Sequence, residues 1–229
     1  MKYVIDFGPI PALPVEGSSD TFPVGRIYCV GRNYAEHARE MGHDPNEAPP
    51  FFFGKPADAL VTGGADMPYP TETTDLHHEI ELVAALGGGG TDIAVEDALT
   101  YVWGYAAGID MTRRDVQATA KKGGRPWDMA KGFDHSAPVG LLVPAMNLGA
   151  HPTKGAITLT VNGASRQSGD IAEMIWDLPH VIAYLSKWVE LKRGDLIFTG
   201  TPAGVAAVSR GDVLEGEIAG IGTVRTTIV

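Results

Sequence analysis

The sequence has only one cysteine, Cys29, among its 229 residues. A single cysteine excludes an internal disulfide, and its place in the apolar run "IYCVG" predicts a buried core residue rather than a nucleophile. This composition fits a reducing, cytoplasmic setting. Long apolar runs are also missing: none approaches the ~18 residues of a membrane helix. Asp6 and three prolines interrupt the N-terminus "MKYVIDFGPIPALP", unlike a signal peptide. We therefore expect neither a secreted nor a membrane-spanning protein.

Positive charge is scarce as well. The chain has 18 lysines and arginines against 28 aspartates and glutamates, a net charge of −10 at pH 7. Such a balance opposes binding to nucleic acid and to anionic membranes. If the substrate is itself an anion, a local cationic cluster or a metal ion must attract it.

Several familiar catalytic motifs are absent. There is no G-x-x-x-x-G-K-[ST] phosphate loop, no G-x-G-x-x-G after a strand and no H-E-x-x-H, and "NGASRQ" lacks the second glycine of a G-x-S-x-G nucleophile elbow. These absences remove the commonest nucleotide-binding, zinc-protease and serine-hydrolase interpretations.

Glycine and proline, in contrast, are abundant. The 29 glycines and 16 prolines form a larger share of the chain than the ~12% of average proteins, which favours many turns and short strands. We therefore expect a β-rich α+β protein. Residues 1–24 are proline-rich and are interpreted as a short N-terminal appendage. Residues 25–229 contain no repeat or linker and are expected to form a single catalytic domain.

The stretch "LHHEIELVAAL", residues 76–86, is typical of a strand that enters the core, yet it contains two glutamates. Side chains two apart on a strand share a face, so Glu79 and Glu81 point the same way. Buried like charges are costly, which leaves two alternatives: a face open to water, or a cation between the carboxylates. The buried strand "YVWGYAAGID" ends at a third carboxylate, Asp110. Hard oxygen ligands without cysteine favour Mg²⁺, Mn²⁺ or Ca²⁺.

Two short helices are expected near these strands. "RNYAEHAREMG" suits a helix that ends at Gly42, on which His37 and Glu40 share a face. They are either an incidental surface pair or an imidazole oriented by a carboxylate to take a proton from water. In "TRRDVQATAKKGG", Thr112 followed by Asp115 predicts a capping box at the start of a helix.

A resemblance to a known family emerges from six blocks that occur in order between about residue 26 and the C-terminus. The blocks are "VGRNYAEHARE", "HHEIEL", "GIDMTRRDVQ", "PWDMAKGFDHSAPVG", "VNGASRQSG" and "LIFTGTPAGV". They resemble the successive signatures of the fumarylacetoacetate hydrolase family. The resemblance implies a mixed β-sandwich roll with short helices, usually found as a homodimer.

The same resemblance implies roles for individual residues. It places Mg²⁺ or Mn²⁺ on Glu79, Glu81 and Asp110, and makes His37 and Glu40 a water-activating dyad. The remaining blocks place further polar residues around the substrate. Lys131 and Gln117 are expected as catalytic residues, and Arg32, Arg114 and Thr201 as substrate-binding residues.

The resemblance also implies a reaction class. The expected substrate is a small 2,4-dioxo acid whose C3–C4 bond is hydrolysed to pyruvate and a carboxylic acid. The stretch "HDPNEAPPFFFGKPADA" extends the resemblance to bacterial fumarylpyruvate hydrolases of the gentisate pathway. The alternatives are an oxaloacetate decarboxylase, a general acylpyruvate hydrolase, an isomerase of 2-oxo-diene dioates, or a metal-binding scaffold without turnover, because fold does not decide among activities.

Overall fold

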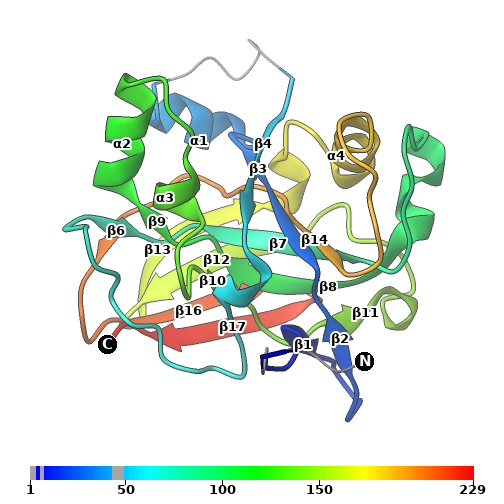
Figure 1. The fold of residues 1–229 in the computed structure, drawn as a ribbon, viewed down its shortest axis with the longest axis horizontal. Helices are drawn as coiled ribbons and strands as arrows, with labels where there is room; N and C mark the ends of the chain where they lie inside the picture. The colour runs from blue at the N-terminus through cyan, green and yellow to red at the C-terminus, as the bar shows by residue number, and fades with distance from the viewer. Residues whose placement is uncertain (1–3, 6–7, 43–48) are drawn as a thin grey trace.

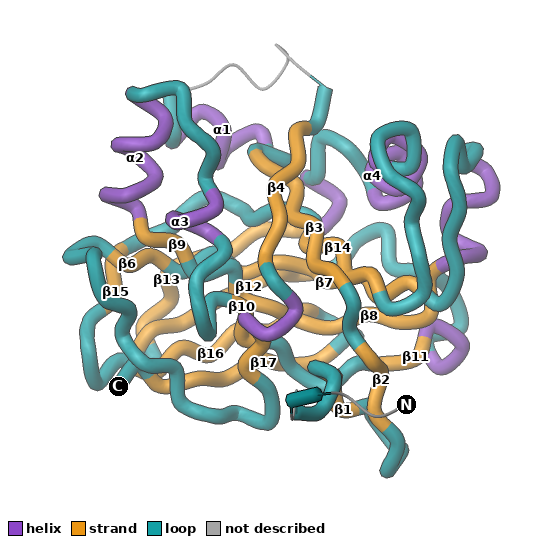
Figure 2. The backbone as a smooth tube through the Cα atoms, in the orientation of Figure 1, coloured by secondary structure: helices purple, strands orange, loops and turns teal. Residues whose placement is uncertain are grey.

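Strands dominate the computed structural model, which describes residues 4–5, 8–42 and 49–229 (Figures 1 and 2). Residues 43–48, the first six of the stretch "HDPNEAPPFFFGKPADA", therefore lie outside the described residues. Helices are few and short: α1 is Ala35–Glu40, α2 is Arg114–Lys122, α3 is Asp128–Lys131 and α4 is Leu178–Leu185. Within the described part, no helix is long and apolar enough to cross a membrane. The predicted β-rich α+β class is confirmed.

A six-stranded sheet forms the centre of the fold, with its strands in the order β11-β8-β7-β14-β3-β4. All neighbouring pairs are antiparallel except β14 and β3. The strands of this sheet are β3 Arg26–Gly31, β4 Phe51–Lys55, β7 Ile80–Leu86, β8 Val102–Ile109, β11 Val143–Pro144 and β14 Asp195–Phe198.

A four-stranded antiparallel sheet, in the order β13-β12-β16-β17, packs against β7 and β8 of the central sheet. In Figure 1, β16 and β17 of this sheet lie low in the view, while α1, α2 and α3 gather together at the upper left. The four strands are β12 Ala156–Val161, β13 Ala164–Asp170, β16 Val213–Ile218 and β17 Gly222–Thr227. Five further strands have two residues each: β5 Leu60–Val61, β6 Leu76–His77, β9 Thr112–Arg113, β10 Ala137–Pro138 and β15 Ala207–Val208.

Strand β7 is buried along its whole length because both of its faces are covered. Ile80 and Leu82 lie in the core cluster shared with the four-stranded sheet. Val83 and Ala85 point the other way and join a second core cluster. Glu81 lies on the same face of β7 as Val83 and Ala85, because side chains two apart on a strand share a face. Its carboxylate therefore points toward the side where α1, α2 and α3 lie.

The N-terminal segment forms a small hairpin of β1 Ala12–Pro14 and β2 Thr21–Pro23. Leu13 is fully buried in the second core cluster, and its neighbour Pro14 accepts a hydrogen bond from the Leu142 amide. The hairpin therefore contributes apolar surface to the core. The boundary between an appendage at 1–24 and a domain at 25–229 stays a prediction.

Candidate active site and metal centre

Three buried carboxylates meet at the end of the central sheet. Glu79 directly precedes β7, Glu81 lies within it opposite Gly108 of β8, and Asp110 directly follows β8. The Asp110 amide donates to the Glu79 carbonyl at 2.8 Å, which fixes the two strand ends together. Carboxylate oxygens of the three residues lie within 4.8 Å of one another. The sequence prediction that these side chains converge is thus matched by the geometry.

Cationic side chains compensate two of the carboxylates. Lys131 Nζ donates to Glu79 Oε2 at 2.7 Å and to Asp110 Oδ2 at 2.6 Å. An Arg114 nitrogen donates to Glu79 Oε1 at 2.6 Å, and Lys55 Nζ lies 2.8 Å from Asp110 Oδ1. Burial opposes ionisation of Glu79, but Lys131 and Arg114 outweigh it and lower its pKa. Glu79 is therefore held as a carboxylate.

Glu81 differs from the other two because no ion pair reaches it within the described chain. Its side chain is buried, and Glu81 Oε2 accepts a hydrogen bond from the Gly200 amide at 2.7 Å. Burial, together with the negative charges of Asp110 and Glu79, raises the pKa of Glu81 well above its usual range. A cluster of three buried oxygen ligands, one of which has no cationic partner among the described residues, fits a hard divalent cation such as Mg²⁺ or Mn²⁺.

Gly200 can deliver that amide because of its backbone conformation. Its φ is +94°, in the left-handed region that glycine adopts without strain, and a Cβ there would lie 2.7 Å from the Asn33 Cβ. Asn33 in turn anchors the segment before α1: its amide donates to the carbonyls of Trp176 and Thr199, each at 2.8 Å. Sequence reasoning missed this anchoring role, although Asn33 stands inside the quoted motif "VGRNY".

The predicted dyad forms on α1. His37 Nδ1 lies 3.1 Å from Glu40 Oε2, and the His37 side chain is buried while that of Glu40 is one-third exposed. The Glu40 carboxylate also accepts from the Gly204 amide at 3.2 Å and 3.3 Å. Glu40 therefore orients the imidazole and ties α1 to the loop after β14. Among the described residues, His37 Nε2 has no hydrogen-bond partner.

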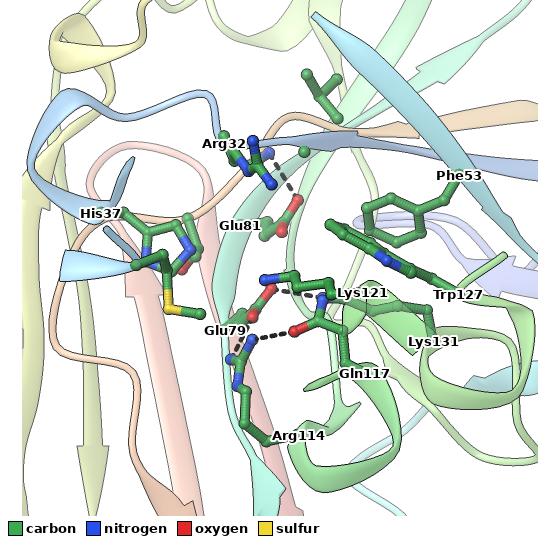
Figure 3. A pocket seen from close by; sticks show the side chains of 15 residues that line it. Arg32, His37, Phe53, Glu79, Glu81, Arg114, Gln117, Lys121, Trp127 and Lys131 are labelled. Carbon is green, nitrogen blue, oxygen red and sulfur yellow. Dashed lines mark hydrogen bonds and ion pairs between the residues drawn. The ribbon is translucent and has the colours of Figure 1, made fainter. Parts of the chain in front are cut away.

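A cavity lies over the carboxylates (Figure 3). Eight of the ten residues that the sequence predicted for the site line it, and the other two, Glu40 and Asp110, lie directly behind His37 and Lys131. The predicted residues that line it are Arg32, His37, Glu79, Glu81, Arg114, Gln117, Lys131 and Thr201. The structure therefore brings all of the predicted site residues to one place.

Two uncharged polar side chains in the cavity are held by hydrogen bonds from neighbouring side chains. Gln117 Oε1 accepts from Arg114 at 2.8 Å, which leaves the Gln117 amide nitrogen free to donate. Thr201 Oγ1 accepts from Gln167 Nε2 at 2.8 Å, and Gln167 Oε1 accepts from the Ile80 amide at 3.0 Å. The fully buried Gln167 thereby connects the strand of the carboxylates to the loop of Thr201.

Sequence reasoning missed seven further residues that line the cavity, and Phe53, Lys121 and Trp127 are among them. A signal for Lys121 was present, because it follows Gln117 by four and Arg114 by seven residues on α2 and so shares their face. Burial, with the positive charges of Arg114 and Arg32, lowers the pKa of Lys121 to about 8.

Comparisons with known proteins agree with this geometry. The family model described as "Fumarylacetoacetate (FAA) hydrolase C-terminal" matches residues 26–229. The chain belongs to this family. The crystal structure of fumarylpyruvate hydrolase from Pseudomonas aeruginosa in complex with Mn²⁺ and pyruvate is 51% identical in sequence. It superposes with a TM-score of 0.97, and the match covers 100% of this chain and 99% of that one. The family fold that the sequence resemblance implied is confirmed.

Curated relatives carry other activities. The mitochondrial oxaloacetate tautomerase of Rattus norvegicus is 43% identical over 199 residues, which are 87% of this chain and 89% of that protein. The mitochondrial oxaloacetate decarboxylase of Dictyostelium discoideum is 41% identical over 200 residues, 86% of this chain and 90% of that protein. The chain is thus an enzyme of the fumarylacetoacetate hydrolase family with an acidic triad suited to a divalent metal ion.

Proposed function

We propose that this enzyme hydrolyses the C3–C4 bond of an acylpyruvate, with fumarylpyruvate as its preferred substrate, yielding fumarate and pyruvate. The observation that carries the proposal is the meeting of the carboxylate triad and the His37–Glu40 dyad at one cavity. The triad suits the 2-oxo acid end of such a substrate, and the dyad suits activation of water. The likeness to the Pseudomonas aeruginosa enzyme supports the same assignment.

The residues of the triad would hold Mg²⁺ or Mn²⁺ through one carboxylate oxygen each. Such an ion would polarise the 2-oxo acid end of the substrate and favour the enolate that leaves as pyruvate. Lys131 donates to both Glu79 and Asp110 and so holds the two carboxylates in place for this ligation. Gly200 fixes the Glu81 carboxylate from the other side.

Water attack on the C4 carbonyl is assigned to the dyad. Glu40 holds His37 through Nδ1, so Nε2 takes a proton from the attacking water. The oxygen that adds to C4 becomes part of the released carboxylic acid. As the C3–C4 bond breaks, its electron pair goes to C3, which is then protonated to give pyruvate.

Negative charge that develops on the C4 oxygen needs hydrogen-bond donors. The Gln117 amide nitrogen lines the cavity and has no partner in the part of the chain that the structure describes. Lys131 has a third ammonium proton beyond the two that it gives to Glu79 and Asp110. Both donors are fixed before the substrate binds, which makes them effective in a buried site.

A panel of substrates tests the proposal. We expect pyruvate release from fumarylpyruvate in the presence of Mg²⁺ or Mn²⁺, and its loss when a chelator removes the metal ion. Fumarylpyruvate should exceed acetylpyruvate and oxaloacetate in kcat/KM. Equal values for fumarylpyruvate and acetylpyruvate would instead indicate a general acylpyruvate hydrolase.

A second candidate activity is decarboxylation or tautomerisation of oxaloacetate. It is favoured by the curated relatives at 41% and 43% identity. Oxaloacetate carries the same 2-oxo acid group, so the triad would hold it in the same way. A kcat/KM for oxaloacetate above that for fumarylpyruvate would make this the main activity. The homodimer implied by the family resemblance stays a prediction, which the molar mass in solution would test.

A further inference from the structure

The cations of the cavity fall into two groups. Lys131 and Arg114 form ion pairs with the carboxylates of the metal centre. Arg32 and Lys121 line the same cavity, yet neither forms an ion pair with any carboxylate among residues 8–42 and 49–229. An enzyme with a net charge of −10 therefore keeps two uncompensated positive charges at its active site.

Lys121 is held by the wall of the cavity. Its Nζ lies 5.0 Å from the centroid of the Trp127 ring, within the range of a cation–π contact. The Trp127 ring is itself fixed edge-on against Phe51, with centroids 5.0 Å apart, and lies tilted against Phe53 at 5.8 Å. The Trp127 ring thus positions the Lys121 ammonium, whose protons have no acceptor among the described residues.

Arg32 lines the same cavity as Lys121. It follows β3 with a φ of +59°, a conformation rare for arginine, and its guanidinium lies 5.3 Å from the Phe51 ring centroid. Its buried Nε has no hydrogen-bond partner in the described structure. The positive charge of Arg32 is one of the causes that lower the pKa of Lys121, after burial and Arg114. The two charges are therefore close enough to repel each other.

Two neighbouring cations with unused donors are the arrangement expected of a carboxylate-binding site. Their lack of a carboxylate partner among the described residues decides which carboxylate of the substrate they would bind. The 2-oxo acid group is assigned to the metal centre, where Arg114 and Lys131 are already paired. Lys121 and Arg32 remain for an anionic group at the far end of the substrate. Phe53 and Trp127 line the same cavity, and their flat rings suit a flat, unsaturated carbon chain.

We propose that Lys121 is a specificity-determining residue that, together with Arg32, binds the distal carboxylate of a dicarboxylic acyl chain. The assignment rests on the proposed acylpyruvate hydrolysis. Under this assignment, contacts with Lys121 distinguish a substrate that has two carboxylates from a substrate that has one. A lost charged hydrogen bond corresponds to about 10- to 100-fold in affinity.

Kinetics of three variants test the assignment. Lys121→Met should lower kcat/KM for fumarylpyruvate by about 10- to 100-fold and for acetylpyruvate by less than about threefold, because acetylpyruvate has no distal carboxylate. Lys121→Arg should retain most of the preference because it keeps the charge. The matched control is Lys122→Met, which removes an exposed lysine next along α2 and should change neither value. Equal losses for both substrates, or no loss for either, would overturn the assignment.

A binding experiment separates this assignment from the proposed function. Fumarate and crotonate have the same chain, but crotonate carries a methyl group in place of one carboxylate. Calorimetry with the Mn²⁺-loaded protein should show tighter binding of fumarate, and Lys121→Met should abolish that preference. If the wild type cleaved neither acylpyruvate, the proposed function would be wrong. The binding measurement would still test the role of Lys121, because it does not depend on turnover. No preference for fumarate in the wild type would exclude a distal carboxylate site.

Discussion

Lys55 Nζ lies 2.8 Å from Asp110 Oδ1, and both side chains are fully buried. The same ammonium donates to the carbonyl of Met111 at 3.2 Å and to that of Lys131. Lys55 belongs to β4, at the edge of the central sheet, whereas Asp110 follows β8. One side chain thus connects an edge strand to a carboxylate of the metal centre and to the end of α3.

Removing Lys55 should therefore destabilise the metal-free protein. Lys55→Met leaves Asp110 buried with only Lys131 as a cationic partner, and breaking a buried ion pair costs about 3 to 5 kcal/mol. Chemical denaturation without metal should show this loss, and added Mn²⁺ should reverse part of it by supplying positive charge. Lys192→Met is the control, because the exposed Lys192–Glu190 pair should contribute less than about 1 kcal/mol. Equal effects of the two substitutions would contradict the prediction.

Glu81→Gln should have opposite effects on metal binding and on metal-free stability. Loss of one charged ligand should weaken Mg²⁺ or Mn²⁺ binding by at least about 100-fold in calorimetry. The folded metal-free protein holds the Glu81 proton more tightly than the unfolded chain does, because the pKa of Glu81 in the unfolded chain is near the ordinary 4.5. Its stability therefore falls as the pH rises above 4.5, at up to about 1.4 kcal/mol per pH unit.

Glutamine has no proton to lose, so the variant should lack this decline and be more stable than the wild type at neutral pH without metal. Its side-chain oxygen can still accept from the Gly200 amide, which preserves the local geometry. Denaturation curves of both proteins at several pH values, measured in the presence of a chelator, would show whether the variant is the more stable protein at neutral pH. A variant that binds Mg²⁺ as tightly as the wild type would remove Glu81 from the ligand set.

His37→Ala should reduce turnover without changing metal affinity. Loss of a general base commonly costs at least about 100-fold in rate. His180 provides a matched control, because its Nδ1 lies 2.6 Å from Asp177 in a similar histidine–carboxylate pair on the exposed surface of α4. His180→Ala should leave pyruvate release unchanged. Near-normal hydrolysis by His37→Ala would exclude the dyad from the mechanism.

The sequence predicted the parts of this site that depend on local geometry. Strand alternation placed Glu79 and Glu81 on one face, and helix spacing placed His37 beside Glu40. The buried state of Cys29 is confirmed too, and burial raises the pKa of its thiol. Each of these predictions uses residues no more than a few positions apart, or an apolar run.

Contacts between distant segments could not be predicted in this way. The capping box at Thr112 and Asp115 was wrong, because Thr112 belongs to β9 and pairs with His77. Asp115 instead accepts from the Thr73 hydroxyl at 2.6 Å, 42 residues away. The contacts of Lys55 and Gln167 were not predicted for the same reason. A single polar residue within a strand pattern does not indicate which distant residue will pack against it.

The pH dependence of kcat/KM should report the Lys121 ammonium. Burial, Arg114 and Arg32 lower its pKa to about 8, while the negative charge of Glu79 acts in the opposite direction and Lys131 adds further repulsion. A protonated Lys121 binds the distal carboxylate, so kcat/KM for fumarylpyruvate should fall as the pH rises above about 8. In the complex, the bound carboxylate favours the charged form, so kcat should decline only at higher pH. Lys121→Arg should shift the decline in kcat/KM upward, because arginine stays protonated. An unchanged profile in Lys121→Arg would assign the decline to another group.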